Sequence, residues 1–181
     1  VRLMGGEAEQ LTKVTDGIGS YAWSPDGKYI AFTMNDSAAI RIKKDKKEKT
    51  DWQVVDNFDN AQLFVLSLTK DSKGKFPVKQ LSNGPYHVTG MNWSPDSQTI
   101  AFSHQDGSWA NAWPSTNMST VSVNGGAIKS LVSDPGLDAG AEYSPDGKWI
   151  AYETTRGELQ WASKAGFRVI PAGGGKPMEV S

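Results

Sequence analysis

Residue types that support catalysis are scarce in this chain of 181 residues. It contains no cysteine, so a cysteine nucleophile, thiolate metal ligands and disulfides are excluded. Only His87 and His104 could serve as an imidazole base, and no Gly-x-Ser-x-Gly sequence is present that would place a nucleophilic serine on a sharp turn. We therefore identify no candidate catalytic residue within the chain.

Metal and cofactor sites have no more support in the sequence. His87 and His104 lack a second ligand four residues away, and no Glu or Cys completes a zinc-binding spacing. The aspartates do not form the Asp-x-Asp-x-Asp-Gly pattern of a calcium loop, and several lie in turn sequences that favour Asp. The sequence thus predicts neither a metal nor a cofactor, and both histidines are expected to be ordinary hydrogen-bonded side chains.

Charge argues against a nucleic-acid partner. The formal net charge is -1, and the one marked basic run, from Arg41 to Lys49, also contains Asp45 and Glu48. No glycine-rich phosphate cradle lies nearby, so we expect a solvated loop, with docking to another domain as an alternative. No apolar stretch approaches the roughly 20 residues that a membrane-spanning helix needs. These features leave the compartment open between the bacterial periplasm or exterior and the cytoplasm.

The elements that would position any functional residue belong to a repeat. Three segments align without gaps: residues 21–32 (YAWSPDGKYIAF), 91–102 (MNWSPDSQTIAF) and 141–152 (AEYSPDGKWIAY). In each, an aromatic residue ends one strand, Ser-Pro-Asp turns the chain, and an Ile-Ala-aromatic run forms the returning strand. Ser97 replaces the glycine of the other two turns, so we expect a strained or different turn there.

The repeated hairpin residues have a structural role by this interpretation. Pro presets the backbone angle of the second turn position, and Asp suits the next one. The aromatic position is expected to be buried in the core, since an aromatic side chain removes about 150 to 250 Å² from water. These structural repeat residues are Trp23, Pro25, Asp26, Trp93, Pro95, Asp96, Tyr143, Pro145 and Asp146.

Two further strands with a Gly- or Ser-rich turn follow each hairpin, and four antiparallel strands per unit of about 50 residues are typical of a propeller blade. The predicted fold is all-β, a partial β-propeller of about three and a half four-stranded blades. We expect this to be part of a longer chain, because an open sector exposes sheet edges; the alternative is a small ring of four. The predicted units are residues 1–17 (half a blade), 18–84 (a blade with an insertion at 35–61), 85–134 and 135–181.

Long connections between the second and third strands of each blade give the candidate binding surface. They run over residues 35–61, 105–117 and 155–166, and they leave the blades on the face opposite the Ser-Pro-Asp turns. Aromatic and Arg side chains dominate binding at contact surfaces, so we predict that this face contacts a substrate or a partner. The alternative is that each Trp packs its own loop onto the blade. The candidate contact residues are Trp52, Trp109, Trp113, Arg156, Glu158 and Trp161.

The hairpin sequence, preceded by Gly-Gly-x-x-x-x-Leu-Thr, resembles the WD40-like PD40 repeat of TolB and of the propeller in serine peptidases of the prolyl oligopeptidase family. The insertion "RIKKDKKEKTDWQVVDNFDNAQLFVLSL" resembles a stretch of bacterial dipeptidyl and acylaminoacyl peptidase propellers. The resemblance implies a propeller that filters peptide substrates and docks an α/β-hydrolase domain carrying the catalytic Ser, Asp and His. It also leaves open a TolB-like propeller that binds proteins without catalysis; a glycan-processing propeller has less support, since two histidines are too few for its site.

Overall fold

The computed structural model describes residues 7–14, 17–35, 59–157 and 165–180. Within these ranges the chain forms twelve strands and one short 3-10 helix, η1 (Ala110–Ser115). The strands make three four-stranded antiparallel sheets, each with its strands in chain order. The prediction of a partial β-propeller with four-stranded antiparallel blades is therefore confirmed. None of the described segments forms a helix that is long and apolar enough to cross a membrane.

The strand bounds follow the repeat. The first sheet contains β1 (Tyr21–Trp23), β2 (Tyr29–Asn35), β3 (Ala61–Ser67) and β4 (Val78–Gln80). The second contains β5 (His87–Trp93), β6 (Thr99–Gln105), β7 (Asn117–Ser122) and β8 (Lys129–Val132). The third contains β9 (Asp138–Tyr143), β10 (Trp149–Thr154), β11 (Gly166–Pro171) and β12 (Met178–Glu179).

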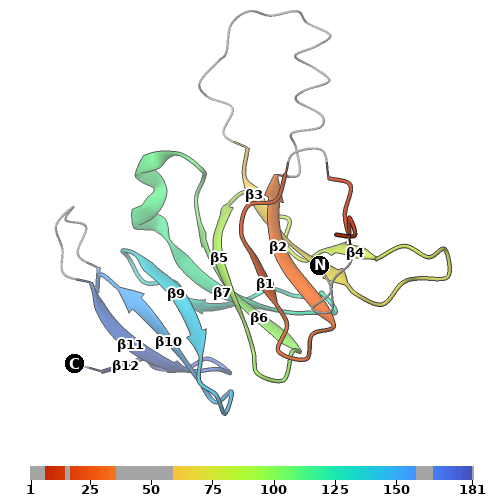
Figure 1. The fold of residues 1–181 in the computed structure, drawn as a ribbon. Coiled ribbons are helices and arrows are strands. Elements are labelled where there is room, and N and C mark those ends of the chain that lie inside the picture. The colour runs from red at the N-terminus through yellow and green to blue at the C-terminus, as the bar shows by residue number, and fades with distance from the viewer. Residues whose placement is uncertain (1–6, 15–16, 36–58, 158–164, 181) are drawn as a thin grey trace, which may run out of the picture.

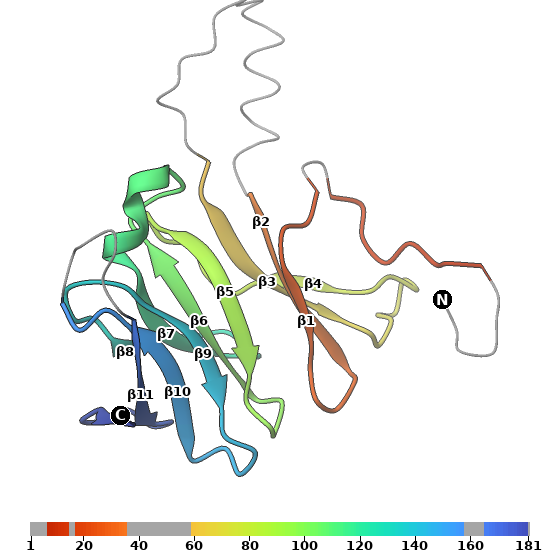
Figure 2. The same cartoon turned by 60° about the vertical axis from the view of Figure 1, so that its left-hand side comes forward.

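The three sheets stand side by side like the blades of an open fan (Figures 1 and 2). The tight turns β1–β2, β5–β6 and β9–β10 all lie at the lower end in Figure 1, whereas η1 lies at the upper end. Strand β5 contacts both β1 and β9, which places the first strands of the three blades next to each other. The described β6–β7 connection and the Ser-Pro-Asp turns therefore lie at opposite ends of the blades, as the repeat predicts.

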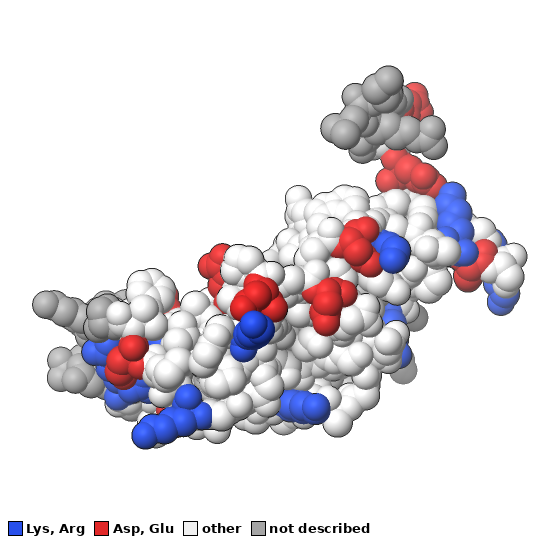
Figure 3. All heavy atoms as spheres, turned by 90° about the horizontal axis from the view of Figure 1, so that it is seen from below, with Lys and Arg blue, Asp and Glu red and all other residues white. Residues whose placement is uncertain are grey.

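The Ser-Pro-Asp turn recurs because its side chains close the turn. The Ser24 hydroxyl donates to Asp26 Oδ1 (2.7 Å) and accepts the N–H of Tyr29 (2.9 Å), so one hydroxyl links both arms of the hairpin. The same Ser-to-Asp bond lowers the pKa of Asp26, because it stabilises the ionised carboxylate. Equivalent bonds of 2.6 Å join Ser94 to Asp96 and Ser144 to Asp146. The aspartates of the first and third turns also form ion pairs with Lys28 and Lys148, and acidic and basic side chains are scattered over the lower face (Figure 3).

Ser97 keeps the turn geometry of the glycines that it replaces. Its φ is 60°, close to the 69° of Gly27 and the 70° of Gly147, so the expected alternative geometry is not adopted. A left-handed backbone costs a non-glycine residue roughly 1 kcal/mol. Ser97 offsets this cost with a bond that glycine cannot make: its hydroxyl accepts the N–H of Asp26 at 3.0 Å, across the boundary between the first and second sheets.

The blades pack through aromatic side chains that reach back to the preceding sheet. Trp93 of the second sheet donates its indole N–H to the carbonyl of Ala22 at 3.1 Å, and its ring lies 6.3 Å from that of Tyr29. The same boundary contains a cluster of buried apolar side chains from both sheets, of which Ala31 and Phe102 are fully buried. Between the second and third sheets the hydrogen bond comes from Asn92 instead: its Oδ1 accepts the N–H of Tyr143 at 3.1 Å. We call these two contact zones the first and second blade boundaries.

The expected burial of the hairpin aromatics is met by Trp93 but not by Trp23. Trp93 is 6% exposed, Tyr143 is half-buried, and Trp23 is 57% exposed. The reason is the direction of packing, because each hairpin aromatic packs on the sheet that precedes its own. Among the described residues no sheet precedes the first one, so the prediction of a core role for Trp23 is wrong within this chain.

Candidate binding face

Of the six predicted contact residues, the described part of the chain contains Trp109, Trp113 and Arg156. Trp52, Glu158 and Trp161 lie outside the described residues. The β6–β7 connection is described throughout, so it shows how this face is built. We use the term binding face for the ends of the three blades that carry the connections β2–β3, β6–β7 and β10–β11.

The β6–β7 connection is a compact structure held by its own polar groups. Gln105 Nε2 donates to the carbonyl of Gly107 at 2.7 Å, and the N–H of Asp106 donates to the hydroxyl of Ser115 at 3.0 Å. That hydroxyl in turn donates to the carbonyl of Ala112 at 2.6 Å. Because Ala112 is also buried beneath the loop, η1 is anchored to the blade from both its polar and its apolar side.

Trp109 packs on its own loop and still presents surface to solvent. A Cβ atom at Gly107 would come within 1.7 Å of the Trp109 ring, so the indole covers the glycine closely. The indole nevertheless remains 39% exposed. Trp109 therefore packs on its own loop, and its role as a contact residue stays a prediction.

Trp113 lies one turn further along η1 and is half-buried. Its carbonyl accepts both the N–H of Thr116 at 3.1 Å and the hydroxyl of the same residue at 2.7 Å, which ends the helix. The backbone of both tryptophans is thus fixed, and side chains on a fixed backbone lose less entropy when they bind a partner.

The side chain of Arg156 contacts residues of its own blade. Its backbone has φ of 55°, and its N–H donates to the hydroxyl of Thr154 at 3.0 Å. The guanidinium forms an ion pair with Glu179 of β12 at 2.9 Å and covers Gly166, where a Cβ atom would lie 2.5 Å from the guanidinium. Glu179 also accepts a bond from Arg168, the main cause of its lowered pKa. Sequence reasoning missed this arrangement, in which Arg156 links the end of β10 to β12.

The two histidines lie near the binding face and have structural partners. His87 Nδ1 accepts the N–H of Ala61 at 3.0 Å, which ties β5 to the start of β3. His104 Nε2 lies 2.9 Å from the Ser119 hydroxyl, and its ring lies 4.6 Å from that of Tyr86. Burial lowers the pKa of both histidines, because it disfavours the imidazolium. Within the described ranges, no three metal-ligating side chains come together.

Asp138 is a buried carboxylate that sequence reasoning did not single out. It is 1% exposed at the second blade boundary, and neither of its oxygens has a hydrogen bond of normal geometry to a described residue. Burial is the main cause of its raised pKa, and the nearby hydroxyl of Thr154 only partly opposes it. Alignment of the repeats gives the missing signal, because the equivalent positions are apolar: Val88 in the second unit and Ile18 in the first.

Comparison with known proteins finds a similar sequence within a peptidase. The chain is 28% identical over 160 residues to the uncharacterised peptidase YuxL of Bacillus subtilis. That match covers 88% of this chain but only 18% of the relative, so the chain spans about a fifth of the protein that it resembles. No family model matches the chain.

Solved structures with the same architecture come from two functional classes. TolB from Acinetobacter baumannii superposes with a TM-score of 0.59 at 19% identity, covering 92% of this chain and 32% of that one. A puromycin-hydrolyzing peptidase from Mycobacterium tuberculosis gives a TM-score of 0.53 at 14% identity, covering 90% and 21%. At such identities the likeness shows the fold alone. The chain is therefore a partial β-propeller that resembles both TolB and the propeller segments of peptidases.

Proposed function

We propose that this chain is the propeller portion of a serine peptidase of the prolyl oligopeptidase family, and that its binding face docks an α/β-hydrolase domain and filters peptide substrates. The observation that carries the proposal is the match to a peptidase over 88% of the chain, since the structural neighbours alone include both classes. The scarcity of catalytic side chains in the sequence fits this division of labour, in which the reaction takes place on the partner domain.

The β6–β7 connection is the part of the binding face best suited to docking. Trp109 offers an exposed indole whose position is set by Gly107, and buried Trp side chains are frequent energetic centres of interfaces. The anchored backbone of Trp113 extends the same structure. Arg156 would act indirectly, by linking the end of β10 to β12 through its ion pair with Glu179.

Filtering would follow from steric exclusion. A ring of blades with its catalytic domain seated on one face admits a flexible peptide through a narrow opening, whereas a folded protein cannot enter. The propeller then selects by size, and the chemical preference for a particular residue is left to the catalytic domain.

The test uses the full-length polypeptide that carries this sequence, with Trp109→Ala and Trp113→Ala. Removal of a tryptophan at an energetic hot spot of an interface costs about 2 kcal/mol or more, which corresponds to a loss of about 30-fold in the association of the domains. We expect faster limited proteolysis between the domains and a lower ratio of peptide to denatured-protein hydrolysis. The control is Ile128→Ala, which removes an exposed apolar side chain, 37% exposed, near the opposite end of the second blade.

The control should leave both quantities unchanged. If the two tryptophan variants behave like Ile128→Ala, then this face neither docks a domain nor filters substrates.

The TolB-like alternative rests on the structural match that covers 92% of this chain with a TM-score of 0.59. In that case the propeller binds proteins and catalyses nothing. A fluorophosphonate probe, which reacts with activated serines, separates the two functions in the full-length polypeptide. Labelling of a single serine supports the peptidase, and lack of labelling together with capture of a protein partner supports the binder.

A further inference from the structure

Two Asn-Gly pairs occur in the chain, Asn83-Gly84 and Asn124-Gly125. Such pairs are prone to an internal reaction, because glycine has no Cβ atom to shield its main-chain nitrogen from the side-chain amide of the asparagine. The two groups are neighbours in the chain, so the reaction gains from their proximity. By sequence the two pairs are equivalent, but the structure gives them different surroundings.

The pair Asn83-Gly84 is restrained on both sides of its glycine. The side chain of Gln62 accepts the N–H of Gly84 at 3.3 Å and donates to its carbonyl at 3.1 Å. Gln62 is itself 4% exposed. The ring of Tyr86 covers the glycine so closely that a Cβ atom there would lie 2.0 Å from the ring. The nitrogen of Gly84 therefore cannot move towards the Asn83 side chain without breaking buried contacts.

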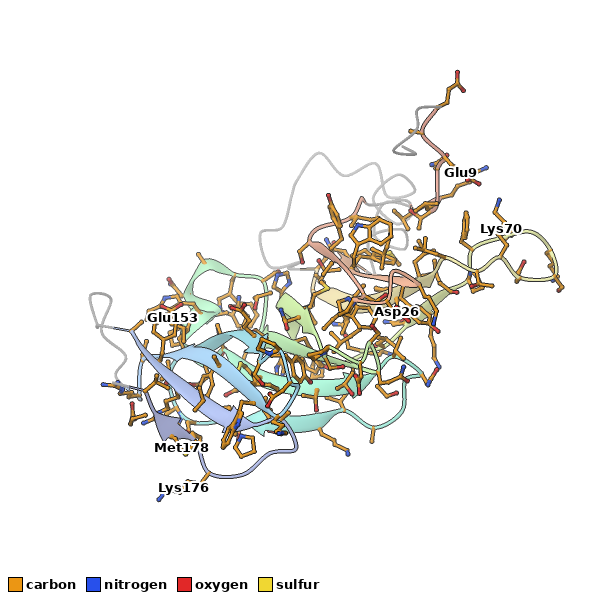
Figure 4. The ribbon with its side chains drawn as sticks, turned by 60° about the horizontal axis from the view of Figure 1, so that its bottom comes forward. Glu9, Asp26, Lys70, Glu153, Lys176 and Met178 are labelled. Atoms are coloured by element: carbon orange, nitrogen blue, oxygen red, sulfur yellow. The ribbon has the colours of Figure 1, made fainter. Side chains whose placement is uncertain are left out.

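The pair Asn124-Gly125 lies in the turn between β7 and β8, where the asparagine is exposed. The N–H of Val123 donates to the carbonyl of Gln98 at 2.9 Å, which places this turn at the same end of the first blade boundary as Asp26 (Figure 4). Gly125 has a φ of 73°, and its N–H donates to a main-chain carbonyl of the same turn at 2.8 Å. A hydrogen bond in an exposed turn opens at a low cost in free energy, so the nitrogen of Gly125 is accessible for reaction.

Lys79 of β4 reaches across the first blade boundary to this turn. Its ammonium group donates to the main-chain carbonyl of Asn124, and a Cβ atom at Gly125 would lie 3.0 Å from Lys79 Cε and 3.1 Å from Nζ. That carbonyl and the nitrogen of Gly125 belong to the same peptide group. A cation at the carbonyl oxygen stabilises the negative charge that the peptide group acquires when its nitrogen loses the proton. Lys79 is therefore placed to activate this nitrogen as a nucleophile.

We propose that Asn124 is a site of spontaneous deamidation, which Lys79 of the neighbouring blade promotes and directs towards isoaspartate. The deprotonated nitrogen of Gly125 forms a bond to Cγ of Asn124, and the bond from Cγ to Nδ2 breaks. The side-chain amide nitrogen leaves as ammonia and takes the proton, so a cyclic succinimide remains. Water then adds to one of the two ring carbonyls and breaks the bond between that carbon and the nitrogen of Gly125.

The position of Lys79 also determines which ring carbonyl reacts. Its ammonium group polarises the former main-chain carbonyl of Asn124, so water adds there in preference to Cγ. The chain then continues through Cγ, and the former main-chain carbon is left as a carboxylate beside Lys79. The product lengthens the main chain of the β7–β8 turn and creates an ion pair across the first blade boundary. This inference does not depend on the proposed peptidase function.

The experiment follows the deamidation of both pairs by peptide mass mapping of the full-length polypeptide that carries this sequence, during incubation at pH 8. Fragmentation of the N–Cα bonds distinguishes isoaspartate from aspartate. In the folded protein, Asn124 should react about tenfold faster than Asn83 or more, because Gly84 must first lose its buried hydrogen bonds. In urea, where both pairs are exposed, the two rates should converge.

Lys79→Gln tests the role of the cation, and Lys79→Arg is the matched control that retains the charge. Because a hydrogen bond from a charged donor is stronger than one from a neutral donor, Lys79→Gln should slow the reaction of Asn124 about five- to tenfold. It should also lower the share of isoaspartate in the product and leave the rate at Asn83 unchanged. Lys79→Arg should keep both the rate and the share close to those of the parent.

Three results would overturn the proposal. They are equal rates at Asn124 and Asn83 in the folded protein, a rate at Asn124 that Lys79→Gln leaves unchanged, and a share of isoaspartate that the same variant leaves unchanged. Peptidase activity is not measured in any of these comparisons, so failure of the proposed function would leave the test intact.

Discussion

The buried carboxylate of Asp138 yields the sharpest prediction, because the repeat itself supplies the replacement. Val88 fills the equivalent position in the second blade and is 2% exposed, against 1% for Asp138. A buried polar group without a good partner costs roughly 1 to 3 kcal/mol. Asp138→Val should therefore raise the free energy of unfolding by about 1 to 3 kcal/mol at pH 7, or the Tm by about 2 °C or more in a chain of this size.

The pH dependence gives this prediction its sign. The pKa of Asp138 is higher in the folded chain than in the unfolded one, so the folded state holds its proton more tightly. Its contribution is most favourable below the unfolded value near 3.8, and it is lost as the pH rises through the raised folded value. The advantage of Asp138→Val over the unchanged chain should accordingly grow with pH and then level off.

Thermal and urea unfolding of the 181-residue chain at a series of pH values between 4.5 and 8 measures this difference. The reciprocal change, Val88→Asp, serves as the matched control and should destabilise the chain increasingly as the pH rises. An Asp138→Val variant that is less stable than the parent at pH 7 would refute the reasoning, since it would mean that the carboxylate has a stabilising partner in solution.

Three further changes test other parts of the structure. His87 should make stability fall as the pH drops below about 6.5, because its lowered pKa means that the folded state resists the proton that the unfolded state takes up; His87→Gln should flatten this fall in a pH series of melting curves. Ser97→Ala should cost about 1 kcal/mol in urea unfolding, since it keeps the left-handed backbone but loses the bond to Asp26, while Ser97→Gly should lie within about 0.5 kcal/mol of the parent. Equal values for the two variants would contradict this account. Gly107→Ala should displace the Trp109 indole and shift its fluorescence, and an unchanged spectrum would show that the ring does not rest on the glycine in solution.

The sequence was sufficient for the architecture because the repeat encodes local geometry. Ser24 and its two equivalents make the same bonds to the following aspartate in every turn, so copies of the motif predict copies of the hairpin. The direction of blade packing was not predictable in this way, since it is a property of neighbouring sheets. The place of Trp23 in the repeated hairpin therefore predicts a core position, although in this chain the residue faces solvent.

The candidate binding face was predicted less completely than the fold. The position of the β6–β7 connection follows from the order of strands, and the structure shows that Trp109 is partly exposed. The ion pair of Arg156 with Glu179 joins residues that are distant in the sequence, so no local sequence pattern predicts it. Asp138 could have been recognised by aligning the repeats, because a charged residue at an otherwise apolar position is visible without a structure.

The two blade boundaries use different hydrogen bonds, which affects how the chain avoids misfolding. The first relies on an indole N–H and a main-chain carbonyl, whereas the second relies on the amide of Asn92 and a main-chain N–H. Blades with near-identical hairpins could otherwise exchange partners during folding, as repeat proteins tend to do. A blade docked on the wrong neighbour would leave a hydrogen-bond donor or acceptor without a partner. The different bonds at the two boundaries therefore favour the arrangement in which the blades pack in chain order.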